Sequence, residues 1–197
     1  MQMFFDPDLF SSFLGFQMDD LLRKSAEELA GALRASSSPC RLVLAESCTG
    51  GLISMVLTAI PGISESFCGS AVTYRNETKA CWLGVSREQL ADPAIGPVSE
   101  ETADQMCRGV LQQTPEATLA AAVTGHLGPN APADLDGVIY IGVAFRHDPK
   151  TRVQQYRLQS SSEFQSGTGA LVREQRRNEA ALLVLQSLLR VMQERAE

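Results

Sequence analysis

The sequence carries a dense group of reactive and small residues at positions 45–51, Ala-Glu-Ser-Cys-Thr-Gly-Gly, between apolar stretches at 42–44 and 52–60. This pattern predicts a strand, a polar turn and the start of a helix. Backbone N–H groups in the first turn of a helix have no partner within the helix, so they can stabilise an anion or an oxyanion. The turn therefore suits nucleophilic chemistry or anion binding.

Ser47 is the first candidate nucleophile, because it follows the predicted strand and precedes the helix N-terminus. Ala45 and Thr49 stand where the G-x-S-x-G elbow has glycine, so that motif is not present here. Two alternatives stay open. Ser47 can simply hydrogen-bond within the turn, or Cys48 can be the nucleophile, since a thiolate is favoured at a helix N-terminus. A buried, small apolar role suits Cys48 better.

Lys79 is the candidate general base, provided that burial lowers the pKa of its amine. Tyr74, five residues earlier, can relay a proton or orient that amine. The alternative is an exposed helix lysine and a half-buried strand tyrosine, each without a catalytic role.

Several nearby residues are candidates for substrate binding. Glu46 can bind a ribose hydroxyl or brace the turn, and Thr49 is a candidate helix cap. Gly50, Gly51 and Gly125 can bring backbone N–H groups close to a phosphate.

Two arginines, Arg173 and Arg177, lie one turn apart at the start of the last predicted helix. Such a pair can clamp a phosphate or a carboxylate. The alternative is that both arginines are solvated.

Hydrophobic periodicity predicts the elements that position these residues. Helices are expected at 18–35 and 50–60. Two more are expected after the candidate caps Asn76 and Ser99, and a last one after a Ser/Gly-rich loop at 160–169. Strands are expected at 41–45, 70–75, 119–124, 138–145 and 152–158. Strands that alternate with helices indicate an α/β fold with a largely parallel sheet covered on both faces. The final hairpin adds one antiparallel strand.

Sites in such sheets lie beyond the carboxyl ends of the strands. The first strand leads to Ser47, the second leads to Tyr74 with Lys79 one turn into the next helix, and the third ends at 124–126, Thr-Gly-His. We therefore expect these three groups, including Thr124, to converge on one rim of the sheet.

Length and composition favour one cytoplasmic domain, residues 18–197, preceded by an irregular arm at 1–17 that packs on the domain or on a partner subunit. A loosely ordered tail is the alternative for the arm. The net charge of −6 argues against nucleic-acid binding, and no apolar run approaches a membrane span. Five cysteines without a CxxC motif indicate reduced thiols, and two histidines supply neither a metal site nor a Ser-His-Asp triad.

From about Met18 to the C-terminus, the sequence resembles the C-terminal domain of the CinA family, whose stand-alone members are nicotinamide-nucleotide amidohydrolases (NMN deamidases). The matching stretches, in order, are 45–51 (AESCTGG), 72–79 (VTYRNETK), 83–85 (LGV), 97–100 (PVSE), 123–129 (VTGHLGP), 137–142 (GVIYIG) and 173–180 (RxxxRxxA).

The resemblance implies hydrolysis of the carboxamide of nicotinamide mononucleotide to nicotinate mononucleotide and ammonia, without a metal or other cofactor. It also implies a three-layer α/β/α sandwich with a mixed, mostly parallel sheet of about five strands, and a homo-oligomer. By position, Ser47 would be the nucleophile, activated by Lys79 and Tyr74. Thr124 and Arg173 would hold the substrate, with Arg173 near its phosphate. N–H groups of residues 49–51 would support the oxyanion or the phosphate.

The chain departs from the family pattern in the expected substrate loops. Leu171-Val172-Arg173 replaces Gly-Asp-Arg, Asn130-Ala131-Pro132 replaces a glycine pair, and His126 replaces a small apolar residue. The predicted catalytic residues are intact, so the sequence supports the chemistry better than the substrate. Alternatives are an amidase for another amide, a non-catalytic nucleotide-binding or regulatory protein of the same fold, and a thiol enzyme that uses Cys48.

Overall fold

A computed structural model describes residues 7–159 and 169–195. Its sheet has the order β2-β1-β3-β4-β5, formed by Phe67–Val72, Leu42–Glu46, Leu119–Gly125, Val138–Phe145 and Arg152–Arg157. Strand β1 runs parallel to β2 and β3, whereas β4 is antiparallel to both β3 and β5. The predicted mixed, mostly parallel five-stranded sheet is confirmed, with β4 as its one reversed strand.

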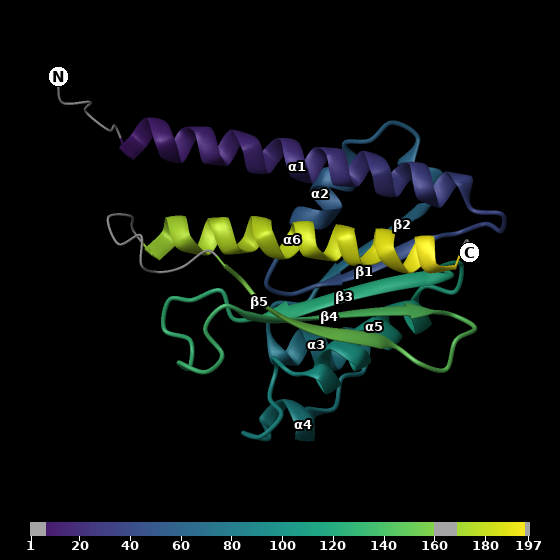
Figure 1. The fold of residues 1–197 in the computed structure, drawn as a ribbon. Helices are drawn as coiled ribbons and strands as arrows, with labels where there is room; N and C mark the ends of the chain where they lie inside the picture. Colours follow the sequence, from purple (N-terminus) through teal and green to yellow (C-terminus); the bar gives the residue numbers. More distant parts are fainter. Residues whose placement is uncertain (1–6, 160–168, 196–197) are drawn as a thin grey trace.

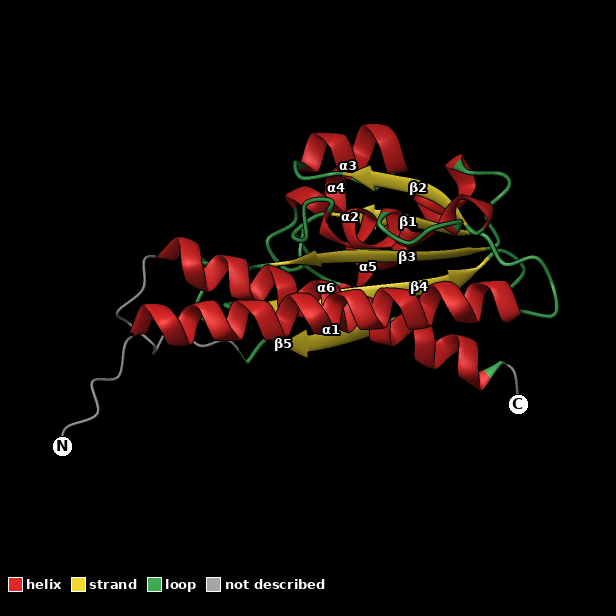
Figure 2. Ribbon diagram, turned by 90° about the horizontal axis from the view of Figure 1, so that it is seen from above, coloured by secondary structure: helices red, strands yellow, loops and turns green. Residues whose placement is uncertain are grey.

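Helices cover both faces of this sheet, so the predicted three-layer α/β/α sandwich is also confirmed (Figure 1). One face carries α1 (Pro7–Ala35), α2 (Leu52–Thr58) and α6 (Gly169–Glu194); the other carries α3 (Asn76–Leu83), α4 (Arg87–Ala91) and α5 (Glu100–Gln113). A short 3₁₀ helix, Ile63–Glu65, precedes β2. Figure 2 shows β2 and β3 pointing toward the same end of the molecule.

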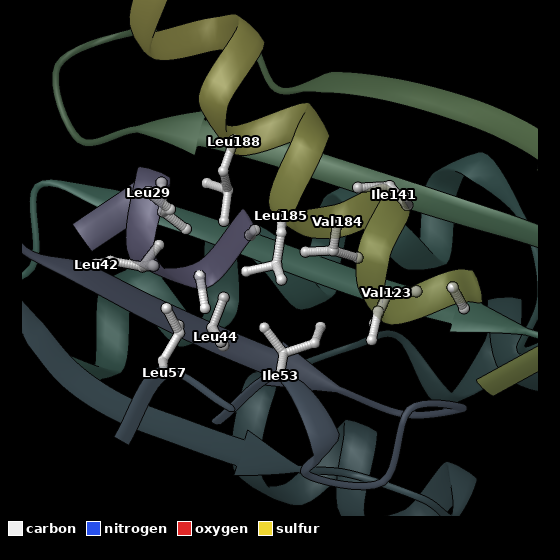
Figure 3. Packing of buried hydrophobic residues seen from close by; sticks show 14 of the residues in the cluster. Leu29, Leu42, Leu44, Ile53, Leu57, Val123, Ile141, Val184, Leu185 and Leu188 are labelled. Atoms are coloured by element: carbon white, nitrogen blue, oxygen red, sulfur yellow. The ribbon is translucent and has the colours of Figure 1, made fainter. Parts of the chain in front are cut away.

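The two faces of the sheet bury side chains of different size. Leu42 and Leu44 of β1 point toward α1, α2 and α6, whereas the alternate residues Val43 and Ala45 point toward α3 and α5. Figure 3 shows the larger cluster, in which leucines of α1, β1 and α6 interdigitate. The alanines of β3 on the opposite face leave space for α5 to approach the sheet closely.

Three predicted boundaries were wrong. Helix α1 begins at Pro7, so residues 7–17 are not irregular; residues 1–6 lie outside the described residues, as does the expected loop at 160–168. Strand β2 ends at Val72, because its pairing with β1 stops at Glu46, and Tyr74 therefore lies beyond the sheet. Asn76 is the first residue of α3, not its cap, whereas Ser99 caps α5 as predicted, accepting from Thr102 N at 3.1 Å.

Candidate active site

The ends of β1 and β3, the start of α3 and the start of α6 surround a cavity of about 230 Å³. Its lining includes Ser47, Tyr74, Lys79, Thr124 and Arg173. The structure therefore brings together residues that are up to 126 positions apart in the chain, and the predicted convergence at one rim of the sheet is confirmed.

Ser47 and Lys79 form a buried pair at the floor of this cavity. The amine Nζ of Lys79 lies 2.9 Å from Ser47 Oγ and donates a second hydrogen bond, also 2.9 Å long, to the carbonyl of Thr73. Only 7% of Ser47 and 2% of Lys79 is exposed. The carbonyl of Thr73 fixes the amine, so that its remaining hydrogen-bonding capacity faces the serine hydroxyl.

Burial lowers the pKa of Lys79 to about 8, because the charged amine has lost most of its hydration. About a tenth of the amine is therefore neutral at pH 7, far more than for an ordinary lysine, and this neutral form can accept a proton from Ser47. A lowered pKa is the condition under which Lys79 was predicted to act as a general base.

Glu46 directly precedes the candidate nucleophile Ser47 and is fully buried. Its carboxylate accepts hydrogen bonds from backbone N–H groups of α2 and the preceding turn and from hydroxyl groups; the donors are Thr49 Oγ1, Gly51 N, Ile53 N, Ser54 N, Ser54 Oγ and Ser70 Oγ. The carboxylate occupies the anion-binding end of α2. Of the two roles expected for Glu46, the structure supports bracing the turn rather than binding a ribose.

The same geometry corrects the expectations for Thr49, Gly50 and Gly51, none of which lines the cavity. Thr49 does not cap α2, since its hydroxyl donates to Glu46 and Gly51 holds the cap position with a left-handed φ of 96°. Gly50 N donates to Ser47 O and Gly51 N donates to Glu46, so neither N–H faces a ligand. The backbone conformation of this turn is what the two glycines contribute.

Two other N–H groups of the turn remain available. Within the described part of the chain, the N–H groups of Cys48 and Thr49 have no backbone or side-chain acceptor from another residue. Cys48 also lines the cavity. These donors follow Ser47 directly, which is where an oxyanion formed on its substrate would need them.

Tyr74 and Arg173 form the outer part of the cavity. Arg173 donates one hydrogen bond to the Tyr74 hydroxyl and another to the carbonyl of Gly128. Tyr74 is 58% exposed and forms no hydrogen bond with Ser47 or Lys79. Of the two routes expected between Ser47 and Lys79, directly or through Tyr74, the geometry has the direct one, and the amine is oriented by Thr73 O rather than by Tyr74.

The remaining predicted binding residues divide into two groups. Thr124 and Gly125 line the cavity, and Thr124 Oγ1 donates to Pro97 O at 2.6 Å. A side chain at Gly125 would collide with Ile139, which explains the glycine there. Arg177 does not line the cavity; it is exposed and lies 4.0 Å from Glu174, so its predicted place in an arginine clamp is wrong.

Asn130 lines the cavity and lies in a loop that the sequence already assigned to the substrate, whereas Asn76 also lines it but was expected only as a helix cap. The amide of Asn76 carries no local signal for this place, because only the tertiary fold brings α3 to the cavity. Among the residues that the structure describes, none that lines the cavity is acidic, although the protein as a whole carries a charge of −6. The described lining, with Lys79 and Arg173, is therefore electropositive and favours an anionic ligand.

The thiol of Cys48 does not fit the nucleophile role. Burial raises the pKa of Cys48 to about 12, so the group is an unreactive thiol at neutral pH. The structure therefore disfavours a thiol enzyme built on Cys48.

No group of three or more His, Cys, Asp or Glu side chains gathers at a metal-binding distance in the described residues. Helices long and apolar enough to cross a membrane are likewise not found among them.

Residues 22–189 match the family model described as the CinA C-terminal domain. The chain belongs to this family. It is 39% identical over 148 residues, 74% of its length, to a protein of Moorella thermoacetica described as competence-damage inducible, and 46% identical over 120 residues, 60% of its length, to a CinA-like protein of Chloroherpeton thalassium. These stretches cover 35% and 28% of the two relatives, so the chain matches about a third of their length.

Solved structures of CinA proteins have the same fold. A competence-damaged protein (CinA) superfamily protein of Klebsiella pneumoniae is 27% identical with a TM-score of 0.72, covering 88% of this chain and 98% of its own. A competence/damage-inducible protein of Agrobacterium tumefaciens is 33% identical with a TM-score of 0.65, covering 83% and 95%. The predicted membership of the CinA family is confirmed.

Within this CinA domain, some of the departures from the family pattern noted in the sequence line the cavity. His126 and Asn130 do so, whereas residues 171 and 172 only precede the lining residue Arg173. Burial lowers the pKa of His126, so its imidazole is mostly neutral at pH 7.

Proposed function

We propose that this CinA-family chain is an amidohydrolase that converts the carboxamide of nicotinamide mononucleotide to nicotinate mononucleotide and ammonia. The observation that carries the proposal is the buried 2.9 Å contact between Lys79 Nζ and Ser47 Oγ. A neutral amine beside a serine hydroxyl at the floor of a cavity is an arrangement for nucleophilic catalysis.

The proposed reaction begins when neutral Lys79 accepts the Ser47 proton and Ser47 Oγ attacks the amide carbon. The N–H groups of Cys48 and Thr49 hold the resulting oxyanion. Lys79 then gives its proton to the leaving nitrogen, so that ammonia departs and an ester to Ser47 remains. Water, deprotonated by Lys79, hydrolyses the ester and regenerates the hydroxyl.

The outer part of the cavity supports a substrate with a phosphate. The guanidinium of Arg173 lies at the cavity wall, and the described part of the lining holds no acidic residue that would oppose an anion. The N-terminus of α2 is already occupied by the carboxylate of Glu46, so the phosphate is expected at Arg173. Thr124 accepts from the substrate, because its own hydroxyl hydrogen is committed to Pro97.

The test measures ammonia released from nicotinamide mononucleotide by the wild type, by Ser47→Ala and by Ser187→Ala. Ser187 is a matched control, since it is a buried serine of α6 that lies outside this cavity. We expect release by the wild type and by Ser187→Ala only. Undiminished release by Ser47→Ala would exclude the assigned nucleophile.

A second candidate is an amidase for a different anionic amide. The polar side chains of His126 and Asn130, which line the cavity, favour it. Ammonia release from other carboxamides that carry a phosphate or carboxylate, but not from the nucleotide, would support it. A binding protein without turnover would instead show thermal stabilisation by the nucleotide and no product.

Two further expectations belong to this proposal: the chain acts in the cytoplasm, and it forms a homo-oligomer. Light scattering of the purified protein tests the second.

A further inference from the structure

A partly buried ion pair contacts the loop of residues 126–131, which is called the substrate wall below. Arg176, in the second turn of α6, donates two hydrogen bonds to Asp136, 2.7 Å from Nη1 to Oδ1 and 2.8 Å from Nη2 to Oδ2. The Arg176 side chain is only 6% exposed. Neither residue lines the cavity. A paired, bidentate geometry of this kind fixes the orientation of both side chains.

The loop of residues 126–131 packs against this ion pair at Gly128. A Cβ atom at Gly128 would lie 2.9 Å from Arg176 Nη1 and 3.0 Å from Asp136 Oδ1, so the backbone at Gly128 packs against both charged groups. The φ of Gly128 is +64°, which glycine adopts without strain. The carbonyl of the same glycine accepts from Arg173. Direct contacts therefore run from the ion pair through Gly128 to Arg173.

Hydrogen bonds join the two ends of the loop 126–137 close to the same ion pair. Gly137 N donates to His126 O at 3.0 Å, and His126 N donates to Val138 O at 2.9 Å. A Cβ atom added at Gly137 would lie 3.6 Å from Arg176 Cζ, so the backbone there packs against the guanidinium. The ion pair thus contacts the loop both at its base and at Gly128, and it joins α6 to a wall that has no regular secondary structure.

We propose that the Arg176–Asp136 ion pair is a positioning element, which holds residues 126–131 and Arg173 in the geometry that binds the anionic part of the substrate. This inference rests on the proposed function for its kinetic effect. The Ser47–Lys79 pair is held by β1, α2 and α3, without contact to Arg176 or Asp136. Loss of the ion pair therefore weakens substrate binding and leaves the chemical step in place.

The experiment compares Asp136→Asn and Arg176→Lys with Asp136→Glu, which keeps the charge, and with Val184→Ala, which removes packing from a buried residue of the same helix. For Asp136→Asn we expect KM for nicotinamide mononucleotide to rise about tenfold with kcat changed less than about threefold. Arg176→Lys is expected to be intermediate, and Asp136→Glu is expected to recover part of the loss.

Hydrogen exchange supplies a readout that does not depend on activity. Peptides covering 126–137 are expected to exchange faster in Asp136→Asn, while peptides covering 42–54 stay as in the wild type. Unchanged exchange of 126–137, or a general increase that matches Val184→Ala, overturns the inference. If the wild type releases no ammonia while exchange rises only at 126–137, the proposed function fails and the positioning role stands.

Discussion

One wall of the cavity, which carries Ser47, is formed by a strand end and a helix start, whereas a second wall is the loop 126–131, contacted by side chains of α6. In the first wall, one buried carboxylate, Glu46, accepts the hydrogen bonds of the turn that places the nucleophile. In the second, two arginines from a helix distant in sequence fix an irregular backbone. The comparison suggests that the chemistry and the substrate preference of this domain are encoded separately.

The largest effect is expected from removing the base in the first wall. Lys79→Met should lower kcat/KM for the proposed amide by about a thousandfold, because Ser47 loses its proton acceptor. Lys150→Met, at an exposed lysine, is the matched control and should have no effect. Steady-state ammonia release measures both. Retention of activity within tenfold of wild type would remove Lys79 from the mechanism.

The second prediction concerns the stability of the same wall. Glu46→Gln should lower the free energy of unfolding by about 2–4 kcal/mol, because the amide NH₂ group faces donors that need an acceptor. Urea denaturation measures the change. Glu194→Gln, which breaks an exposed ion pair with Arg152, should change stability by less than about 1 kcal/mol. Equal effects of the two variants would contradict the bracing role.

The third prediction addresses the substrate wall. Arg173→Gln should raise KM by roughly tenfold to a hundredfold, since the proposed phosphate loses its charged partner, while kcat changes less. Arg177→Gln should leave KM within about twofold, because its side chain lies outside the cavity. Initial rates at varied nucleotide concentration give KM and kcat for both variants. A larger effect at position 177 would restore the arginine clamp expected from the sequence.

The smallest effect is the pH dependence that Lys79 imposes. With a pKa of about 8, the neutral amine increases from about a tenth of the molecules at pH 7 to about nine tenths at pH 9, so kcat/KM should rise about tenfold. The unfolded chain, with the ordinary value of 10.5, binds more protons between pH 8 and 10.5, so stability contributed by this group rises with pH across that window. A rate profile that is flat from pH 7 to 9 would contradict the assigned base.

Much of the fold followed from local patterns. The helix expected at 18–35 is present and buries one apolar stripe, Leu22, Ala26, Leu29 and Leu33, and the expected hairpin is present as β4 and β5. The end of β2 was misplaced because strand length depends on pairing: β1 stops at Glu46, so Tyr74 has no partner strand. The role of Tyr74 changed with its position, from a relay on Lys79 to a contact of Arg173.

The sequence by itself determined the strand–turn–helix that carries Ser47, the α/β class and the family, because a strand, a turn of reactive residues and a helix start are adjacent in the chain and their spacing limits their geometry. Only the tertiary structure decided which N–H groups Glu46 consumes, which of Arg173 and Arg177 reaches the cavity, and that Arg176 supports its wall. Arg173 and Arg177 point only about 40° apart around the helix but lie about 6 Å apart along its axis, so the place where α6 begins beside the cavity decides that Arg173 reaches it.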